Sequence, residues 1–201
     1  MSVKSLRDEH ADATRAALLS SARELFTQHG FNGVSAEQIA KHARVTRGAL
    51  YHHFEDKKEL FGSVCDEVGD EVGQRVQDIA LPLANEDPWR GFGLGVDEFL
   101  DACAEDDFWR RVVLEGPAVF GWQEWREHGE QHMIGLIKLG LQMLMDAGII
   151  ARQPIELVAP MLFSVMTEAA MVIVHADDRK TARREVGETV HRLIEGLRIN
   201  S

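Results

Sequence analysis

The chain has 201 residues and a formal net charge of −11, and this length is enough to bury a hydrophobic core in one domain or in two small ones. The total charge argues against a general nucleic-acid binder, but the charge is unevenly distributed. Residues 1–60 hold nine Lys and Arg against eight Asp and Glu, a net charge of +1, whereas residues 61–201 hold 13 against 25, a net charge of −12. We therefore expect only the N-terminal quarter to face a phosphate backbone.

The chain has two cysteines, Cys65 and Cys103, and each stands alone inside a helical pattern. This arrangement indicates neither a disulfide framework nor a zinc knuckle and favours a reduced compartment. No uncharged apolar run reaches about 18 residues, and the N-terminus lacks the apolar region of a signal peptide. We expect a cytoplasmic protein that is neither secreted nor embedded in a membrane.

The first predicted helix covers residues 12–29, where apolar residues recur at helical spacing. Gly30 is expected to end this helix, because glycine readily adopts the left-handed conformation found after a helix. Residues 1–11 are polar, and Lys4 and Arg7 either follow a DNA groove or only solvate the chain terminus. The helix is expected to support the adjacent motif.

Residues 35–58 have the pattern of a helix-turn-helix. Ser35 and Gln38 form a capping box, which predicts that a helix begins at Ala36. Thr46 can cap a second helix over residues 47–53 in the same way. The predicted core shared by the first three helices consists of Leu25, Phe26, Phe31, Val34, Ile39, Val45, Leu50 and Phe54.

The second helix of this motif is expected to point four side chains outward, those of Arg47, Ala49, His52 and His53. An exposed helix with basic and small side chains is what insertion into a DNA groove needs. The stretch therefore predicts a DNA-reading head.

A longer helix is predicted from Lys57 to about Ile79, opened by a second capping box formed by Asp56 and Glu59. Lys57 and Lys58 lie in its first turn, where a cation opposes the helix dipole. They indicate either an anionic partner such as a DNA phosphate or a simple solvated pair.

Gly69 and Gly73 weaken the same helix and allow it either to bend or to pack closely against a neighbour. A break is predicted at residues 81–88 because of Pro82 and Pro88. Further helices are predicted over residues 89–103, 108–114, 122–147, 154–175 and 181–198, with an interruption at residues 116–117.

The helix at residues 154–175 is apolar nearly all round, so we expect it to be buried on more than one side. Together with the helix at residues 181–198 it can bury one side internally and another against a second copy of the chain. The sequence has no convincing strand alternation.

The sequence gives little support for catalysis or for a cofactor. Gly91, Gly93 and Gly95 do not follow a strand, so they do not form a phosphate-binding fingerprint. His128 and His132 have a spacing that suits a metal, but their otherwise polar helix face favours an exposed pair without metal. The acidic residues 105–107 are expected to cap the following helix, and no nucleophilic constellation is visible. We expect a protein that is not an enzyme.

Bulky aromatic residues and methionines in the C-terminal part can form the walls of an apolar cavity, although each taken alone is more often a core residue. Glu168 stands in an apolar helix and therefore needs a partner, which is an arginine, a dimer contact, or an amine or hydroxyl of a ligand. The candidate ligand-binding residues are Phe92, Phe99, Trp109, Trp122, Trp125, Met133, Met166 and Glu168.

The N-terminal stretch, roughly residues 12–61, resembles the TetR family of bacterial transcriptional regulators. The residues that carry the resemblance are Ile39, Ala40, Val45, Leu50, Tyr51, His53, Phe54, Lys57 and Leu60. The resemblance implies that the second helix of the motif reads the major groove. It implies phosphate contacts by Tyr51, His53, Lys57 and Ser35, and groove contacts by Thr46, Arg47, Ala49 and His52. The complete candidate DNA-binding set is Ser35, Arg44, Thr46, Arg47, Gly48, Ala49, Tyr51, His52, His53 and Lys57.

Arg44 departs from the family pattern, because the family usually has glycine at this helix end. If the position needs a positive φ, Arg44 bears a conformational cost, for which a DNA contact by its guanidinium would compensate. Residues 116–126 also resemble a ligand-domain segment of some family members.

The sequence thus predicts an all-α protein of about nine helices. Residues 1–56 form a three-helix DNA-binding domain, and residues 57–201 form a larger ligand-binding and dimerisation domain with residues 57–79 as connecting helix. The expected function is repression from a palindromic operator by a homodimer, joined through residues 155–175 and 181–198 and released by a small, partly apolar effector. The alternatives are an activator or a ligand-independent repressor and, less favoured, a helical small-molecule enzyme or carrier.

Overall fold

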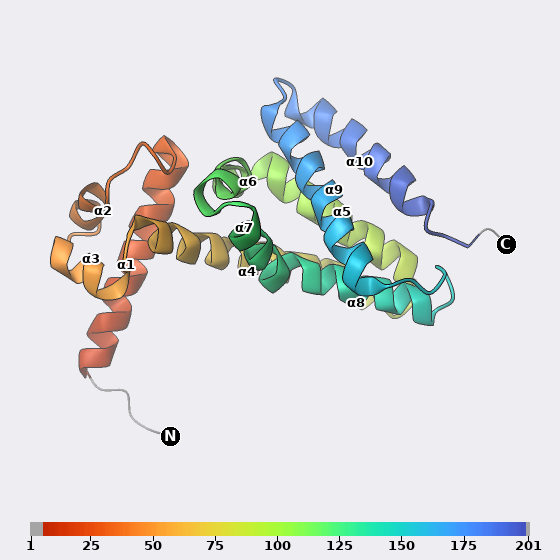
Figure 1. Ribbon diagram of the computed structural model, residues 1–201, viewed down its shortest axis with the longest axis horizontal. Helices are drawn as coiled ribbons and strands as arrows, with labels where there is room; N and C mark the ends of the chain where they lie inside the picture. The colour runs from red at the N-terminus through yellow and green to blue at the C-terminus, as the bar shows by residue number, and fades with distance from the viewer. Residues whose placement is uncertain (1–5, 200–201) are drawn as a thin grey trace. The chain divides into compact units, whose positions relative to one another are not determined.

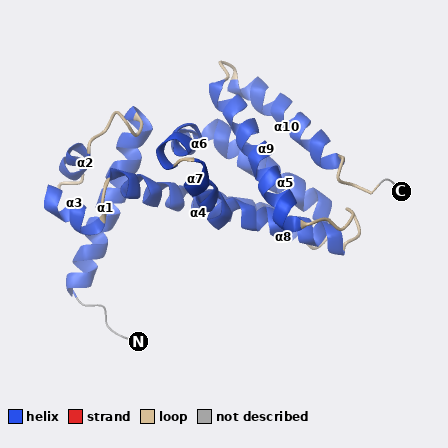
Figure 2. Ribbon diagram, in the orientation of Figure 1, coloured by secondary structure: helices blue, strands red, loops and turns tan. Residues whose placement is uncertain are grey.

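Helices form nearly all of the chain in the computed structural model, which describes residues 6–199, without the side chains of residues 6, 7 and 130 (Figure 2). The two alternatives for Lys4 and Arg7, a DNA groove or solvent, concern a residue and a side chain outside the described part of the chain. Within this range the only β-type pairing is an isolated antiparallel bridge between Ile150 and Arg198. The expected all-α fold is confirmed. The chain divides into two units, up to Glu67 and from Val68 onward.

The first unit contains α1 (Leu6–His29), α2 (Ala36–His42), α3 (Arg47–His53) and the first part of α4 (Lys57–Ala84). Helix α1 begins earlier than the apolar pattern indicated and ends as expected at Gly30, whose φ is +72°. Most of the predicted core is buried, whereas Leu25, Phe31 and Val45 are half-buried. The buried core residues of this unit include Leu18, Phe26, Val34, Ile39, Leu50, Phe54, Leu60 and Phe61.

Helix α4 begins at Lys57, where the Asp56 carboxylate accepts the backbone N–H of Glu59 at 2.8 Å. The Glu59 side chain returns to the N–H of Glu55 and not to that of Asp56, so the expected capping box is displaced by one residue. The expected end near Ile79 was wrong, since α4 continues through Pro82 to Ala84. Its last turn is stabilised by packing, because Ala84 is buried against the start of the following helix at Gly91.

The second unit continues with six more α-helices and one π-helical turn. They are α5 (Pro88–Glu105), α6 (Asp107–Phe120), α7 (Trp122–Gly129), the π-helix η1 (Glu130–Ile134), α8 (Gly135–Asp146), α9 (Ile155–His175) and α10 (Arg179–Glu195). Asp106 caps α6 by accepting the N–H of Trp109 at 2.7 Å, as the acidic run predicted.

The interruption expected at Gly116-Pro117 is absent, because α6 continues to Phe120 and ends at Gly121 with φ +79°. A Cβ atom at Gly116 would lie 2.2 Å from the Trp125 ring, so this glycine serves close packing of α6 against that ring. The helix expected over residues 122–147 is divided into α7, η1 and α8. Gly148, with φ +68°, closes α8 as expected.

Helix α9 packs against α5, α8 and α10, and α9 and α10 run side by side (Figure 1). One side of α9 is buried as expected, and a row of its apolar residues is exposed, with Leu157 at 64% and Met161 at 67%. The expected burial of this other side against a second copy of the chain stays a prediction. Among the described helices, α9 alone has the length and apolar composition to cross a membrane, a test that core helices of soluble proteins also pass. Its buried side belongs to the helical packing of the second unit.

Candidate nucleic-acid interface

The motif α2–turn–α3 is held by side-chain caps at the start of both helices. The Ser35 hydroxyl oxygen accepts the N–H of Gln38 at 3.2 Å, and the Gln38 side chain accepts the N–H of Ser35 at 2.8 Å. Thr46 Oγ1 accepts the N–H of Ala49 at 3.1 Å. Each cap satisfies a backbone donor that the first helical turn leaves without a partner. Both hydroxyl oxygens thus act as helix caps. The expected DNA contacts of Ser35 and Thr46 would be made by hydroxyl groups that already accept these backbone hydrogen bonds.

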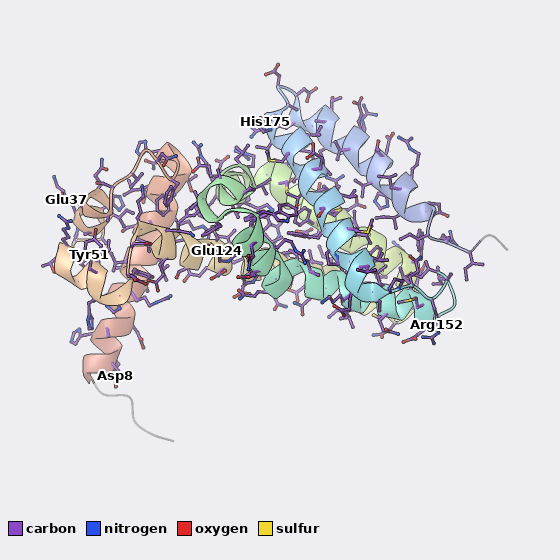
Figure 3. The ribbon with its side chains drawn as sticks, viewed as in Figure 1. Asp8, Glu37, Tyr51, Glu124, Arg152 and His175 are labelled. Atoms are coloured by element: carbon purple, nitrogen blue, oxygen red, sulfur yellow. The ribbon has the colours of Figure 1, made fainter. Side chains whose placement is uncertain are left out.

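Helix α3 is anchored by Leu50, which is fully buried, and exposes the opposite side of the helix. Arg47, Gly48, Tyr51 and His52 are exposed, and Figure 3 shows where Tyr51 projects from α3. The Arg47 guanidinium lies over the Tyr51 ring, with its Cζ atom 5.4 Å from the ring centre.

Two residues of the expected outward set are less accessible. Ala49 and His53 are half-buried, because both lie toward the side of α3 that faces the rest of the first unit. The His53 ring contacts the rings of both His52 and Phe54, at centroid distances of 5.4 and 6.4 Å. The accessible surface of α3 is therefore formed mainly by the side chains of Arg47, Tyr51 and His52.

Arg44 occupies a position with a positive φ, the case in which the comparison with the family pattern implied a conformational cost. Its φ is +58°, and among the described residues it is the only non-glycine residue with a positive φ. Its N–H donates to the carbonyl of Lys41, and the N–H of Val45 donates to that of Ala40. These two bonds form a Schellman motif that ends α2, in which glycine is the usual residue. The Arg44 side chain is exposed beside the turn.

Lys57 has an internal role that the sequence did not indicate. Its Nζ atom donates to the carbonyl oxygens of Phe31 and Val34, both at 2.8 Å, and lies 4.1 Å from the centre of the Phe31 ring. The ammonium group therefore ties the start of α4 to the α1–α2 connection. The alternative of a solvated Lys57 is wrong, since the residue is half-buried and bound to carbonyls, whereas the phosphate contact implied by the resemblance stays a prediction.

The second unit contains an apolar cavity of about 90 Å³ bounded by α4, α5, η1, α8 and α9. Four of the residues expected to bind a ligand line it, namely Phe92, Phe99, Met133 and Met166. The sequence reasoning missed the contribution of α4 and of the glycines of α5. Gly91 and Gly95 line the cavity, and their missing side chains allow α5 to pack closely on Ala80 and Ala84.

The other four candidates lie outside the cavity. Trp122 is 64% exposed, whereas Trp125 is buried against Gly116. Trp109 is buried edge-on against Phe99, with ring centres 6.0 Å apart. Glu168 is exposed on α9, so it needs no buried partner within this chain. Helical spacing alone showed neither that α6 and α7 lie outside the cavity wall nor which side of α9 faces the cavity.

His128 and His132 do not form the expected exposed pair. The His132 side chain is only 13% exposed, and its Nδ1 atom lies 2.9 Å from Oδ1 of Asp70 on α4. The His128 ring is half-buried against Phe120, at a centroid distance of 4.5 Å. Their sequence neighbours are polar, but both rings lie in contacts between helices, that of His128 from α7 and that of His132 from within the π-helical turn.

A three-helix head with an exposed second motif helix, followed by a helical unit with an apolar cavity, defines a helix-turn-helix protein with a second, cavity-bearing domain. Residues 18–64 match the model described as bacterial regulatory proteins, tetR family, and residues 89–197 match the tetracyclin repressor-like C-terminal domain. The second match covers more than half of the chain. The chain therefore belongs to the TetR family of transcriptional regulators.

Individual relatives agree with this assignment. The chain is 41% identical over 66 residues to the HTH-type transcriptional regulator AcrR of Shigella flexneri, a match that spans 33% of this chain and 31% of that regulator. The crystal structure of a TetR-family regulator from Pectobacterium atrosepticum is 27% identical, with a TM-score of 0.80 over 98% of this chain and 99% of that one. RolR, in a complex with resorcinol, has a TM-score of 0.75 at 20% identity, covering 92% and 89% of the two chains, and shows the same fold.

Proposed function

We propose that the protein represses transcription by binding operator DNA and is released when a small, largely apolar molecule fills the second unit. The observation that carries the proposal is that one chain combines an exposed α3 with an apolar cavity lined by α4, whose first turn belongs to the head. TetR-family regulators are in general not enzymes.

Burial raises the pKa of the Cys103 thiol to about 12, so this thiol remains protonated at neutral pH and is not a reactive nucleophile.

A homodimer is proposed because α9 and α10 leave apolar side chains uncovered on a face of the second unit. The most exposed of them are Leu157, Met161, Val172 and Leu193. A two-fold dimer across these helices buries the same patch from both copies. Two heads related by this symmetry call for a palindromic operator, with half-sites about one helical turn or more apart.

Within each head, we propose that α3 enters the major groove and that Arg47, Tyr51 and His52 make its main contacts. Arg44, Gly48, His53 and the two capping residues Ser35 and Thr46 lie around the same motif and are proposed to contact the DNA backbone. The charge of the chain supports this division, since the acidic second unit repels phosphate. We also expect the protein to be cytoplasmic, because the operator DNA of a bacterial regulator lies in the cytoplasm.

Release is proposed to act through α4. This helix begins with Lys57, which is bound to the α1–α2 connection, and further along it lines the cavity with Val76, Ala80 and Ala84. We propose that α4 has two positions, one in the dimer that fits the operator and one in a dimer that fits it less well. A ligand that binds the second arrangement better shifts the population of dimers toward it. RolR, a structural relative crystallised with resorcinol, supports a small organic molecule as effector.

The test is a mobility-shift assay of the purified full-length protein on DNA from its own upstream region, followed by a screen for small molecules that release it. We expect a specific complex in the presence of competitor DNA and its loss with an apolar compound. In vitro transcription from the bound promoter should fall when protein is added. Absence of a specific complex at low salt contradicts DNA binding, whereas increased transcription contradicts repression and indicates an activator.

Arg47→Ala separates base reading from phosphate contact. If Arg47 reads a base, we expect a loss of about 1–3 kcal/mol on the specific site and little change on random DNA. Lys41→Ala serves as control, because Lys41 is an exposed cation of α2 outside the proposed contact set. Equal losses on both DNAs for Arg47→Ala remove Arg47 from base readout.

A further inference from the structure

A polar cleft of about 280 Å³ lies directly beside the apolar cavity of the second unit, between α4 and the segment formed by η1 and α8. Its polar lining includes the side chains of Asp70, Gln74, Gln77, Gln131 and His132. The apolar cavity contrasts with it, because Gln77 is the single polar side chain among its lining residues. Two compartments of opposite character therefore share one wall of α4.

The cleft is formed by close packing of the π-helical turn against two glycines of α4. A Cβ atom at Gly69 would lie 3.0 Å from Cγ of His132, and one at Gly73 would lie 3.5 Å from the His132 carbonyl oxygen. The two glycines thus serve close packing, which answers the question that the sequence left open. The contact between His132 Nδ1 and Asp70 at 2.9 Å holds the imidazole ring at this wall.

The two compartments meet at Gln77 and Leu136, since both residues line the cavity and the cleft. A molecule whose apolar part fills the cavity would reach polar surroundings by passing Gln77 and Leu136. Gln77 stands at this junction, where its amide can both donate and accept a hydrogen bond. Leaving a polar ligand group in the apolar cavity would cost the hydrogen bonds that it makes with water.

We propose that the cavity and the cleft form one composite site for an amphipathic effector with an apolar body and an uncharged, hydrogen-bonding head such as a hydroxyl or amide group. This inference rests on the proposed effector-binding function and specifies its ligand. Among the described residues, the cleft lining contains no lysine or arginine, and the Asp70 carboxylate repels an anionic head. Asp70 is already in contact with His132, so the site does not single out a cation.

The experiment measures binding of four probes with a common hexyl chain, 1-hexanol, 1-chlorohexane, hexanoate and hexylamine, to the full-length protein by calorimetry. The variant is Gln77→Leu, which removes the amide at the junction and keeps a similar volume. We expect it to weaken 1-hexanol binding about three- to tenfold, the effect of one hydrogen bond, and to leave 1-chlorohexane within about twofold. Gln123→Leu, at an exposed glutamine of α7, is the matched control and should change neither affinity.

For the wild-type protein we expect 1-hexanol to bind more tightly than hexanoate and hexylamine, because Asp70 repels the hexanoate head and because a charged head loses more hydration than a hydroxyl group on entering the cleft. Tighter binding of either ion, equal losses of 1-hexanol and 1-chlorohexane in Gln77→Leu, or no binding of 1-hexanol would each overturn the composite site. The mobility-shift assay is run on the same preparations. Operator binding with release by some other compound would then preserve the proposed function while the composite site is rejected.

Discussion

The described non-glycine residue with the most unusual backbone is Arg44, which ends α2 in a left-handed conformation with a φ of +58°. A left-handed conformation costs an L-residue roughly 1–2 kcal/mol, and Arg44→Gly removes this strain from the folded state. Glycine also makes the unfolded chain more flexible, which offsets part of the gain in stability. We predict that Arg44→Gly raises the free energy of unfolding by up to about 1 kcal/mol, measured by urea denaturation.

Arg47→Gly is the control for this prediction, since residue 47 lies within α3 and glycine weakens a helix. It should lower the same free energy. A loss of stability in Arg44→Gly would show that the backbone at this turn is not strained. If Arg44→Gly is more stable and yet binds the operator less well, the guanidinium itself contacts DNA.

Lys57 joins α4 to the α1–α2 connection through two carbonyl groups. Lys57→Met keeps most of the apolar contact with the Phe31 ring but leaves both carbonyl oxygens without this donor. We predict a loss of about 1–3 kcal/mol in the free energy of unfolding of the head, followed by chemical denaturation.

The exposed Lys41 provides the comparison, and Lys41→Met should stay within about 0.5 kcal/mol of the wild type. Equal effects of the two substitutions would mean that the Lys57 contacts are not stabilising. This role was not predictable from sequence, because the two acceptors lie 26 and 23 residues before Lys57 and offer only backbone atoms.

Among the elements, the crossing of α4 and α5 depends on Gly91. A Cβ atom there would lie 2.9 Å from both the Ala80 carbonyl oxygen and the Ala84 backbone nitrogen, and backbone atoms cannot move aside cheaply. We predict that Gly91→Ala lowers the midpoint of thermal unfolding, corresponding to about 1–3 kcal/mol.

Gly93→Ala is a close control two residues away. Its Cβ atom would lie 3.3 Å from Cε1 of His191, a side chain that can adjust, and the helix propensity of alanine is higher than that of glycine. The midpoint should therefore change little or rise. A similar decrease for both variants would show that loss of glycine, and not the helix crossing, is responsible.

The elements also show which sequence signals were sufficient. Local caps such as Ser35, Thr46 and Asp106 correctly predicted helix starts, because the bonding groups lie within three residues of each other. Pro82 and Pro117 were misleading, because packing keeps α4 and α6 helical through them. Half of the candidate ligand-binding residues line the cavity. Side-chain type correctly identified Phe92 and Met166, but it did not show that Trp122 and Glu168 point away from the cavity, because the direction of a side chain depends on tertiary packing.

At the scale of the whole molecule, the uncovered face of α9 carries the proposed dimer. Met161 is 67% exposed and lies in the middle of this face, between Leu157 and Val165. We predict that Met161→Glu converts a dimer into a monomer, measured by sedimentation at micromolar concentration, because two like charges would be brought together in an apolar contact.

The variant should also lose operator affinity, since a single head contacts only one half-site. Gln123→Glu adds the same charge at an exposed position of α7 and should leave the dimer intact. A monomeric wild-type protein, or a dimer that persists in Met161→Glu, would contradict an interface through α9.

The π-helical turn η1 contains one residue more per turn than the helices on either side of it. A π-helical turn accommodates its extra residue by turning less per residue, so removing one residue from 130–134 would allow α7, η1 and α8 to join as one regular helix with α7 and α8 close to their present angular positions. Trp125 would then stay against Gly116, whereas His132, which lies within the turn, would change its direction relative to the α4 glycines. The length of this short segment thus sets the direction of His132 at the polar cleft, so a change in residue number there alters the wall of the proposed effector site more than it alters the packing of α7 and α8.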